Sequence, residues 1–223
     1  MRPPGWHLVR LSESLGLTLR ERNSMLLRAG YAPAYAESPP ESAAVGPAME
    51  ALRSILAGHL PYPAVVAGPR GELALANAAF EVLTEGAAAH LLAPPVNVLR
   101  LALHPEGMAP RVANLAAWGR HITESLRTRA TAHRDPELDA LIGELTGYLP
   151  PAPPPGPDHL GFAVPLRLHT AEGEVRLLTT LTSFATAVDV TLAELHLEAF
   201  HPADAPTATL LHRRATVTPA APA

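Results

Sequence analysis

Cysteine is absent from the 223-residue chain, which excludes disulfides, thiol nucleophiles and zinc sites built on cysteine. Lysine is absent as well, so all 17 basic side chains are arginine. Aromatic residues make up only 4% of the chain, and we expect a core built mainly from alanine, leucine and valine. No apolar run approaches the ~20 residues of a membrane-spanning helix, and the N-terminus lacks the apolar segment of a signal peptide. These absences predict a cytoplasmic protein with no membrane partner.

The remaining composition is that of a globular protein. Hydrophobic residues make up 48% of the chain and charged residues 17%. The formal net charge of −4 provides no overall attraction to nucleic acid or to anionic membranes. The length suits one sizeable domain with a small appendage.

The first 30 residues predict two short helices. Leu8, Leu11 and Leu15 recur at helical spacing, and a glycine follows them. Thr18 and Glu21 form a capping box, in which each side chain satisfies a free backbone N–H at the start of the second helix. Two helices of this length cannot bury a core alone. We therefore expect them to be the end of another domain or a docking element.

From residue 61 the pattern changes to short apolar runs of strand length. Residues 63–67 and 72–78 flank a Gly-Pro-Arg-Gly turn and predict a hairpin, after which Asn77 is placed to start a short helix. Further along, Trp118 belongs to an apolar helical stripe. Asp135, followed directly by proline, is a strong helix start.

The last third of the chain alternates apolar and polar residues. Residues 162–169, 175–184 and 190–200 predict three strands, and Pro165 indicates an edge position or a bulge. A proline-rich loop at 150–158 precedes them. This order of elements, a hairpin followed by helices and then by antiparallel strands, is typical of an α+β fold. We predict a PAS-like antiparallel sheet of about five strands packed with helices, preceded by a short helical segment.

The motifs that most enzyme classes require are missing. The sequence has no nucleophile elbow, phosphate-binding glycine loop or HExxH zinc helix, and its 11 histidines show no helical pairing with a carboxylate ligand. We expect no catalytic residues, no metal and no cofactor. One group keeps an enzyme open as an alternative, namely His196 with Glu194 and Glu198 on one strand face. The simpler interpretation of that group is a solvated sheet surface.

Polar residues in the apolar middle of the chain predict a ligand site. The candidates are Asn97, Arg100, His104, Asn114 and Trp118. A guanidinium can bind a carboxylate head group bidentately, and the indole can line an apolar tail. In the alternative interpretation, Arg100 lies on the surface, His104 caps a turn and Trp118 belongs to the core.

Three stretches of the sequence together resemble one known family. These are residues 15–35, residues 61–83, and residues 97–118 with 182–204. They are similar to the MmyB-like bacterial transcription regulators, which join an XRE-type helix-turn-helix to a PAS-like ligand-binding domain. The resemblance implies a fatty-acid-like or other apolar small-molecule ligand, and a homodimer.

The resemblance also implies a division into domains. Residues 1–36 correspond to the C-terminal remnant of the helix-turn-helix domain, 37–47 to a linker, 48–212 to the ligand-binding domain and 213–223 to a flexible tail. The recognition helix would precede Trp6. We therefore expect DNA contact only through a missing or separate helix-turn-helix, because phosphate contacts from arginines alone do not read bases.

Three functions follow as hypotheses. The first is a ligand sensor that relays binding through the helix at Pro47–Gly58 to a DNA-binding unit. The second is a stand-alone small-molecule-binding or dimerisation module without DNA binding. The third is a small α+β enzyme that uses His196 with Glu194 or Glu198, and it requires those side chains to lie inside a cavity.

Overall fold

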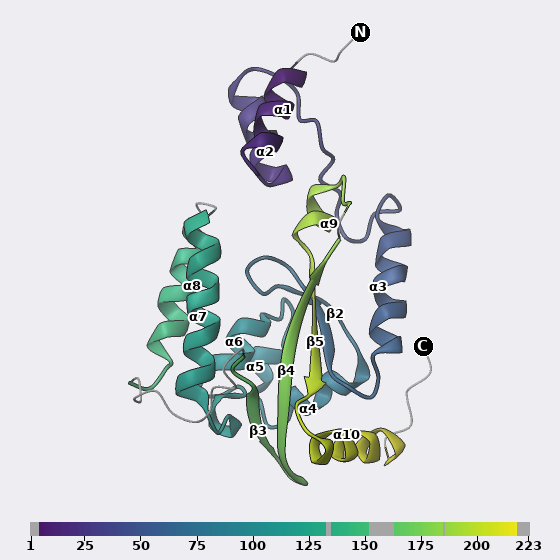
Figure 1. Ribbon diagram of the computed structural model, residues 1–223, viewed down its shortest axis with the longest axis vertical. Helices are drawn as coiled ribbons and strands as arrows, with labels where there is room; N and C mark the ends of the chain where they lie inside the picture. Colours follow the sequence, from purple (N-terminus) through teal and green to yellow (C-terminus); the bar gives the residue numbers. More distant parts are fainter. Residues whose placement is uncertain (1–4, 133–134, 152–162, 185, 218–223) are drawn as a thin grey trace. The chain divides into compact units, whose positions relative to one another are not determined.

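The computed structural model describes residues 5–132, 135–151, 163–184 and 186–217 (Figure 1). Its helices are α1 (Trp6–Ser14), α2 (Leu19–Arg28), α3 (Gly46–Gly58), η1 (Ala78–Phe80), α4 (Glu81–Thr84), α5 (Ala89–Leu92), α6 (Val98–Leu103), η2 (Ala109–Arg111), α7 (Leu115–Ala132), α8 (Pro136–Gly147), α9 (Val190–Glu194) and α10 (Ala205–Val217). Its strands are β1 (Ala64–Ala67), β2 (Leu73–Ala76), β3 (Leu166–Thr170), β4 (Gly173–Ser183) and β5 (His196–Pro202). No helix of the described ranges combines the length and apolar character needed to cross a membrane.

The chain forms two compact units. The N-terminal unit consists of Met1–Leu52 together with the internal segment Ser183–His196. The sheet unit consists of Arg53–Thr182 and Leu197–Ala223. The chain therefore leaves the sheet unit at the end of β4, passes through α9 in the N-terminal unit, and returns along β5.

The capping box predicted for α2 is confirmed. The hydroxyl of Thr18 accepts from the backbone N–H of Glu21, and the Glu21 carboxylate accepts from the backbone N–H of Thr18 at 2.8 Å. Two of the free N–H groups at the start of this short helix are thereby satisfied. The helix starts where the sequence predicts.

Segment 183–196 is held to the N-terminal helices by backbone and side-chain contacts. The N–H of Val190 donates to the carbonyl of Ala36 at 2.8 Å. The Arg20 guanidinium donates to both carboxylate oxygens of Glu194, at 2.6 and 2.9 Å, and it also pairs with Glu37 at 2.7 Å. The segment is thus an integral part of the N-terminal unit.

The prediction of one strand over residues 190–200 is wrong in its first half. The Asp189 side chain accepts from the backbone N–H groups of Thr191 and Leu192, at 2.9 and 3.3 Å, and so caps α9. An N-cap aspartate stabilises a helical turn even in a sequence whose residues alternate like a strand. Strand β5 begins only at His196.

The five strands form one curled antiparallel sheet in the order β2-β1-β5-β4-β3. This arrangement confirms the predicted α+β fold with a PAS-like sheet. In the β3–β4 hairpin Leu166 lies opposite Leu177 and Leu168 opposite Val175, and all four side chains are fully buried. Strand β3 is an edge strand, which agrees with the proline that precedes it.

Asn77 stands at the N-cap of η1, where the sequence predicts the start of a helix. Its side chain makes no capping hydrogen bond to η1. Instead it accepts from the N–H of Ala64 at 3.1 Å and donates to the carbonyls of Leu56 and Tyr62, at 3.1 and 2.8 Å. The asparagine therefore ties the start of β1 to the chain before it.

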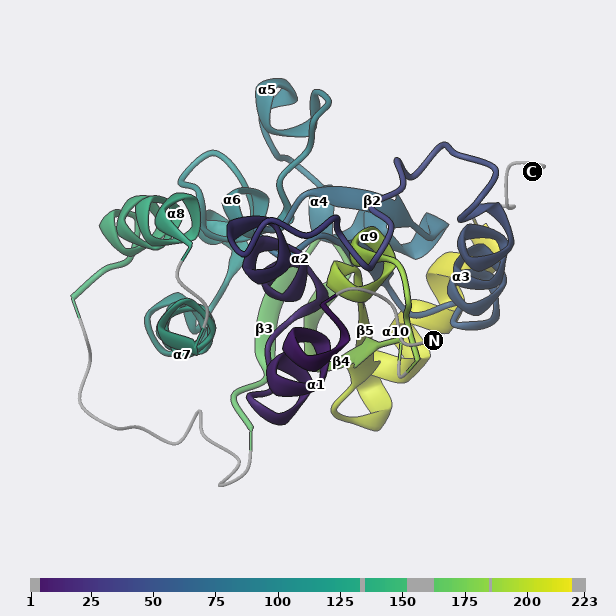
Figure 2. The same cartoon turned by 90° about the horizontal axis from the view of Figure 1, so that it is seen from above.

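Helices α7 and α8 pack side by side on one side of the sheet (Figures 1 and 2). The predicted start of α8 is confirmed, because the Asp135 carboxylate accepts from the N–H groups of Glu137 and Leu138. Apolar side chains of both helices join those of β3 and β4 in one core. The predicted loop at 150–158 lies mostly outside the described residues, as does Phe162. Of the flexible tail predicted at 213–223, residues 213–217 continue helix α10 instead, and the rest lies outside the described residues.

Candidate ligand-binding pocket

A pocket of about 300 Å³ lies inside the sheet unit. Its volume falls at the lower end of the roughly 300–1,000 Å³ typical of small-molecule sites. Helices α6 and α7 and strands β4 and β5 supply most of the wall. The lining residues are Val65, Phe80, Leu83, Val98, Leu101, Ala102, Met108, Trp118, His121, Ile122, Ser125, Leu126, Arg129, Ala163, Val164, Leu178, Thr179, Leu181, Glu198 and Phe200.

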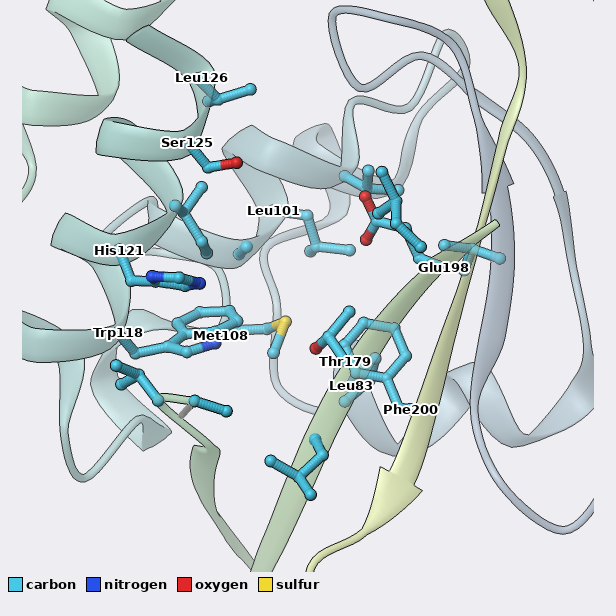
Figure 3. Close-up of a pocket in the computed structure, with 18 of the residues that line it drawn as sticks. Leu83, Leu101, Met108, Trp118, His121, Ser125, Leu126, Thr179, Glu198 and Phe200 are labelled. Carbon is cyan, nitrogen blue, oxygen red and sulfur yellow. The ribbon is translucent and has the colours of Figure 1, made fainter. Parts of the chain in front are cut away.

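The helical wall follows from the periodicity of α7. Trp118, Ile122 and Leu126 recur at spacings of four residues and share one face, which the sequence predicts as apolar. The indole of Trp118 and the thioether of Met108 lie together at one end of the pocket (Figure 3). Both side chains are buried. This part of the wall can accept an apolar group but offers little hydrogen bonding.

Three polar side chains lie on the pocket wall and are exposed to solvent. His121 and Ser125 come from α7, whereas Thr179 comes from β4 on the opposite wall (Figure 3). Because exposed side chains line both walls, the pocket is partly open to solvent.

Two charged side chains also line the pocket, Glu198 from β5 and Arg129 from α7. Burial raises the pKa of Glu198, and the positive charge of Arg129 opposes that shift. Burial lowers the pKa of Arg129, against the attraction of Glu198, Asp135 and Glu72. The Arg129 guanidinium donates to the carbonyl of Pro69 at 2.7 Å. The pocket thus contains a carboxylate whose ionised form is poorly solvated.

Of the five residues predicted to bind a ligand, Trp118 lines the pocket and the other four do not. Asn114 is buried beside strand β3. Its amide donates to the carbonyl of Pro165 at 2.8 Å, and its oxygen accepts from the N–H of Arg167 at 3.1 Å. Both groups of the side chain are therefore committed to joining the start of α7 to the edge strand.

Arg100 has a carboxylate partner within the chain. Its guanidinium donates to the two oxygens of Glu144, both at 2.8 Å, and the hydroxyl of Tyr148 donates to the same carboxylate at 2.9 Å. The hydrogen bond from Arg100 lowers the pKa of Glu144 against the effect of burial. This arrangement is the bidentate geometry expected of Arg100, with α8 supplying the carboxylate.

Asn97 and His104 flank helix α6. The Asn97 side chain caps the helix and donates to the carbonyl of Arg70 at 2.8 Å. Nδ1 of His104 accepts from the N–H of Glu106 at 3.0 Å, and its ring lies 4.9 Å from that of Tyr148. A role for these two residues in ligand binding stays a prediction.

One histidine cluster has the residue types of a metal site. His90, His104 and Glu106 offer ligand atoms within 4.8 Å of one another. Nδ1 of His104 already accepts a hydrogen bond from the N–H of Glu106, and the side chains of His90 and Glu106 are exposed, as in many such clusters that hold no ion. We therefore assign no metal to this cluster.

The charged and polar lining residues His121, Ser125, Arg129 and Glu198 were missed as ligand-site candidates. His121, Ser125 and Arg129 flank or extend the predicted apolar stripe of α7, and this proximity to the stripe is the signal in the sequence that could have found them. Glu198 was grouped with Glu194 on one strand face, but Glu194 belongs to α9. On β5, Glu198 shares its face with His196 and Phe200, since side chains two apart point the same way, and of these two only Phe200 is a lining residue of the pocket.

A family comparison matches the part of the chain that contains the sheet and the pocket. The family described as MmyB-like transcription regulator ligand binding domain matches residues 48–213. The chain belongs to this family. This confirms the resemblance seen in the sequence, and an MmyB-like ligand-binding domain is a regulatory rather than a catalytic kind of domain. A comparison with curated proteins found no match.

Proposed function

We propose that this MmyB-like domain senses an apolar small molecule that binds in the pocket between α7 and the sheet. The observation that carries the proposal is the pocket itself, about 300 Å³ of space with mostly apolar walls in a domain of a ligand-binding family. Ligand binding gains ~25 cal/mol of free energy for each Å² of apolar surface that it removes from water. A molecule with an alkyl chain suits such walls.

The family resemblance contributes the finer features of this proposal. A fatty-acid-like molecule is one candidate ligand, and an XRE-type helix-turn-helix would read the DNA. The regulator would act in the cytoplasm as a homodimer. Ligand binding would change DNA affinity only by the difference between its affinities for two arrangements of the protein.

Ligand binding is tested with three ten-carbon probes, namely 1-decanol, methyl decanoate and decanoate. Any probe that binds the folded protein at 100 times its Kd stabilises it by ~2.7 kcal/mol. For a chain of this size we expect Tm to rise by about 5–10 °C in thermal unfolding. Native mass spectrometry checks that one molecule binds per chain.

A pair of tryptophan variants shows whether the probe occupies this pocket. Ser125 lines the pocket and Thr128 does not, although both are exposed on α7. We expect Ser125→Trp to fill the pocket and abolish the thermal shift, whereas Thr128→Trp keeps it. If no probe shifts Tm or binds in native mass spectrometry, the sensing function is contradicted.

A further inference from the structure

We propose that the pocket selects an apolar ligand whose polar end donates a hydrogen bond, such as an alcohol or a primary amide, and that the Glu198 carboxylate accepts this bond. The inference rests on the proposed function and narrows its ligand class. Three observations support it: the direction of the carboxylate, its lack of a partner, and the charges around Arg129.

The Glu198 carboxylate extends from β5 into the pocket, toward Leu101 of α6 (Figure 3). Its neighbours along the strand, Leu197 and Ala199, are buried on the opposite face. The carboxylate is therefore directed into the ligand space by the alternation of β5, with apolar side chains around it.

Within the part of the chain that the structure describes, this carboxylate has no hydrogen-bond or ion-pair partner. A carboxylate among apolar walls is costly unless donors satisfy its lone pairs. Burial accordingly raises the pKa of Glu198. A ligand that brings an O–H or N–H group would supply the missing donor, and bonds to charged acceptors are among the stronger ones.

The charges around Arg129 disfavour a carboxylate at the polar end of the ligand. The guanidinium already donates to the carbonyl of Pro69. Glu198, Asp135 and Glu72 all act on its single positive charge. A ligand carboxylate would bring a further negative charge next to Glu198, where low solvation strengthens the repulsion. A fatty acid is thus expected to bind more weakly than the matching alcohol.

The test measures the affinities of 1-decanol, methyl decanoate and decanoate by calorimetry at pH 8. The three probes share a ten-carbon chain and differ in whether the head group donates, only accepts, or is charged. We expect the wild-type chain to bind 1-decanol about tenfold more tightly than either of the others, the ratio that one bond to a charged group provides.

Glu198→Gln removes the negative charge and keeps the shape of the side chain. We expect it to bind decanoate about tenfold more tightly than the wild-type chain and 1-decanol severalfold more weakly, which reverses the order. Glu124→Gln is the matched control, because Glu124 is exposed on α7 and outside the pocket lining. This control should leave all three affinities unchanged.

The outcomes separate the two proposals. If the probes bind the wild-type chain equally well, or if Glu198→Gln leaves their order unchanged, the head-group inference is overturned while the sensing function stands. If no probe binds either protein, the sensing function fails and the inference fails with it. If the order of the 1-decanol and decanoate affinities reverses in Glu198→Gln but not in Glu124→Gln, the result supports both the sensing function and the head-group inference.

Discussion

At the scale of single residues, the ionised Glu198 side chain has a cost to the fold, which is set against the role in ligand binding that we propose for it. Its carboxylate faces an apolar pocket, and burial raises its pKa. The folded protein therefore holds a proton on Glu198 more tightly than the unfolded chain does. Stability falls as the pH rises from the ordinary pKa of 4.5 through the raised value, and the full cost is present above both.

Glu198→Gln should therefore stabilise the protein at pH 8. The glutamine side chain does not ionise, so the cost of a poorly solvated charge disappears. We expect Tm to rise by about 2–4 °C, the change that ~1 kcal/mol produces in a chain of this size. The difference from the wild-type protein should narrow as the pH falls toward 4.5. A difference in Tm that stays constant between pH 8 and pH 4.5 would contradict the conclusion that the ionised Glu198 carboxylate destabilises the fold.

At the scale of elements, helix α8 depends on its N-cap residue, Asp135, which directly precedes it. Burial would raise the pKa of Asp135, but the hydrogen bond from Arg70 and those from the N–H groups of Leu138 and Glu137 outweigh it and lower the pKa. Asp135 thus contributes stability that is present above its unfolded pKa and is lost as the pH falls through the folded value. This helix carries Glu144, the partner of Arg100.

We expect Asp135→Ala to destabilise the protein by about 0.5–2 kcal/mol, the usual cost of a lost N-cap, in urea denaturation at pH 7. Asp135→Asn keeps an oxygen for the cap and loses the charge that Arg70 contacts, so its cost should be smaller. Equal losses in the two variants would show that the cap contributes nothing. The loss in Asp135→Asn should shrink at acidic pH.

Local signals in the sequence predicted the elements better than they predicted the site. Caps such as Thr18 and Asp135 act over three or four residues, and both were found where the sequence placed them. Helix α9 was missed because one aspartate cap overrides an alternating pattern. The role of Glu198 depends on which face of β5 the helices cover, and that is decided by long-range packing rather than by alternation.

At the scale of the whole molecule, the N-terminal unit is built from two separate parts of the chain. The bidentate pair between Arg20 and Glu194 joins them, and Glu37 shares the same guanidinium. The side chains of Arg20 and Glu194 are partly exposed, so the pair is worth up to about 1 kcal/mol. It nevertheless holds the peptide bond after Glu194 against the N-terminal helices.

Arg20→Ala should therefore expose α9 to a glutamate-specific protease. A loss of ~1 kcal/mol from local stability corresponds to about fivefold faster cleavage after Glu194 when cleavage follows local opening. Mass spectrometry of the fragments identifies that cut. Arg28→Ala, at the end of the same helix, is the matched control and should cleave at the wild-type rate. Equal rates in both variants would show that the pair does not protect α9.

The chain crosses between its two units three times, and this limits how relatives of this protein can be recombined. A chimera that exchanges residues 1–52 alone would place foreign helices against α9, with Ala36 and Arg20 replaced as partners of Val190 and Glu194. Segment 183–196 has to be transplanted together with those helices.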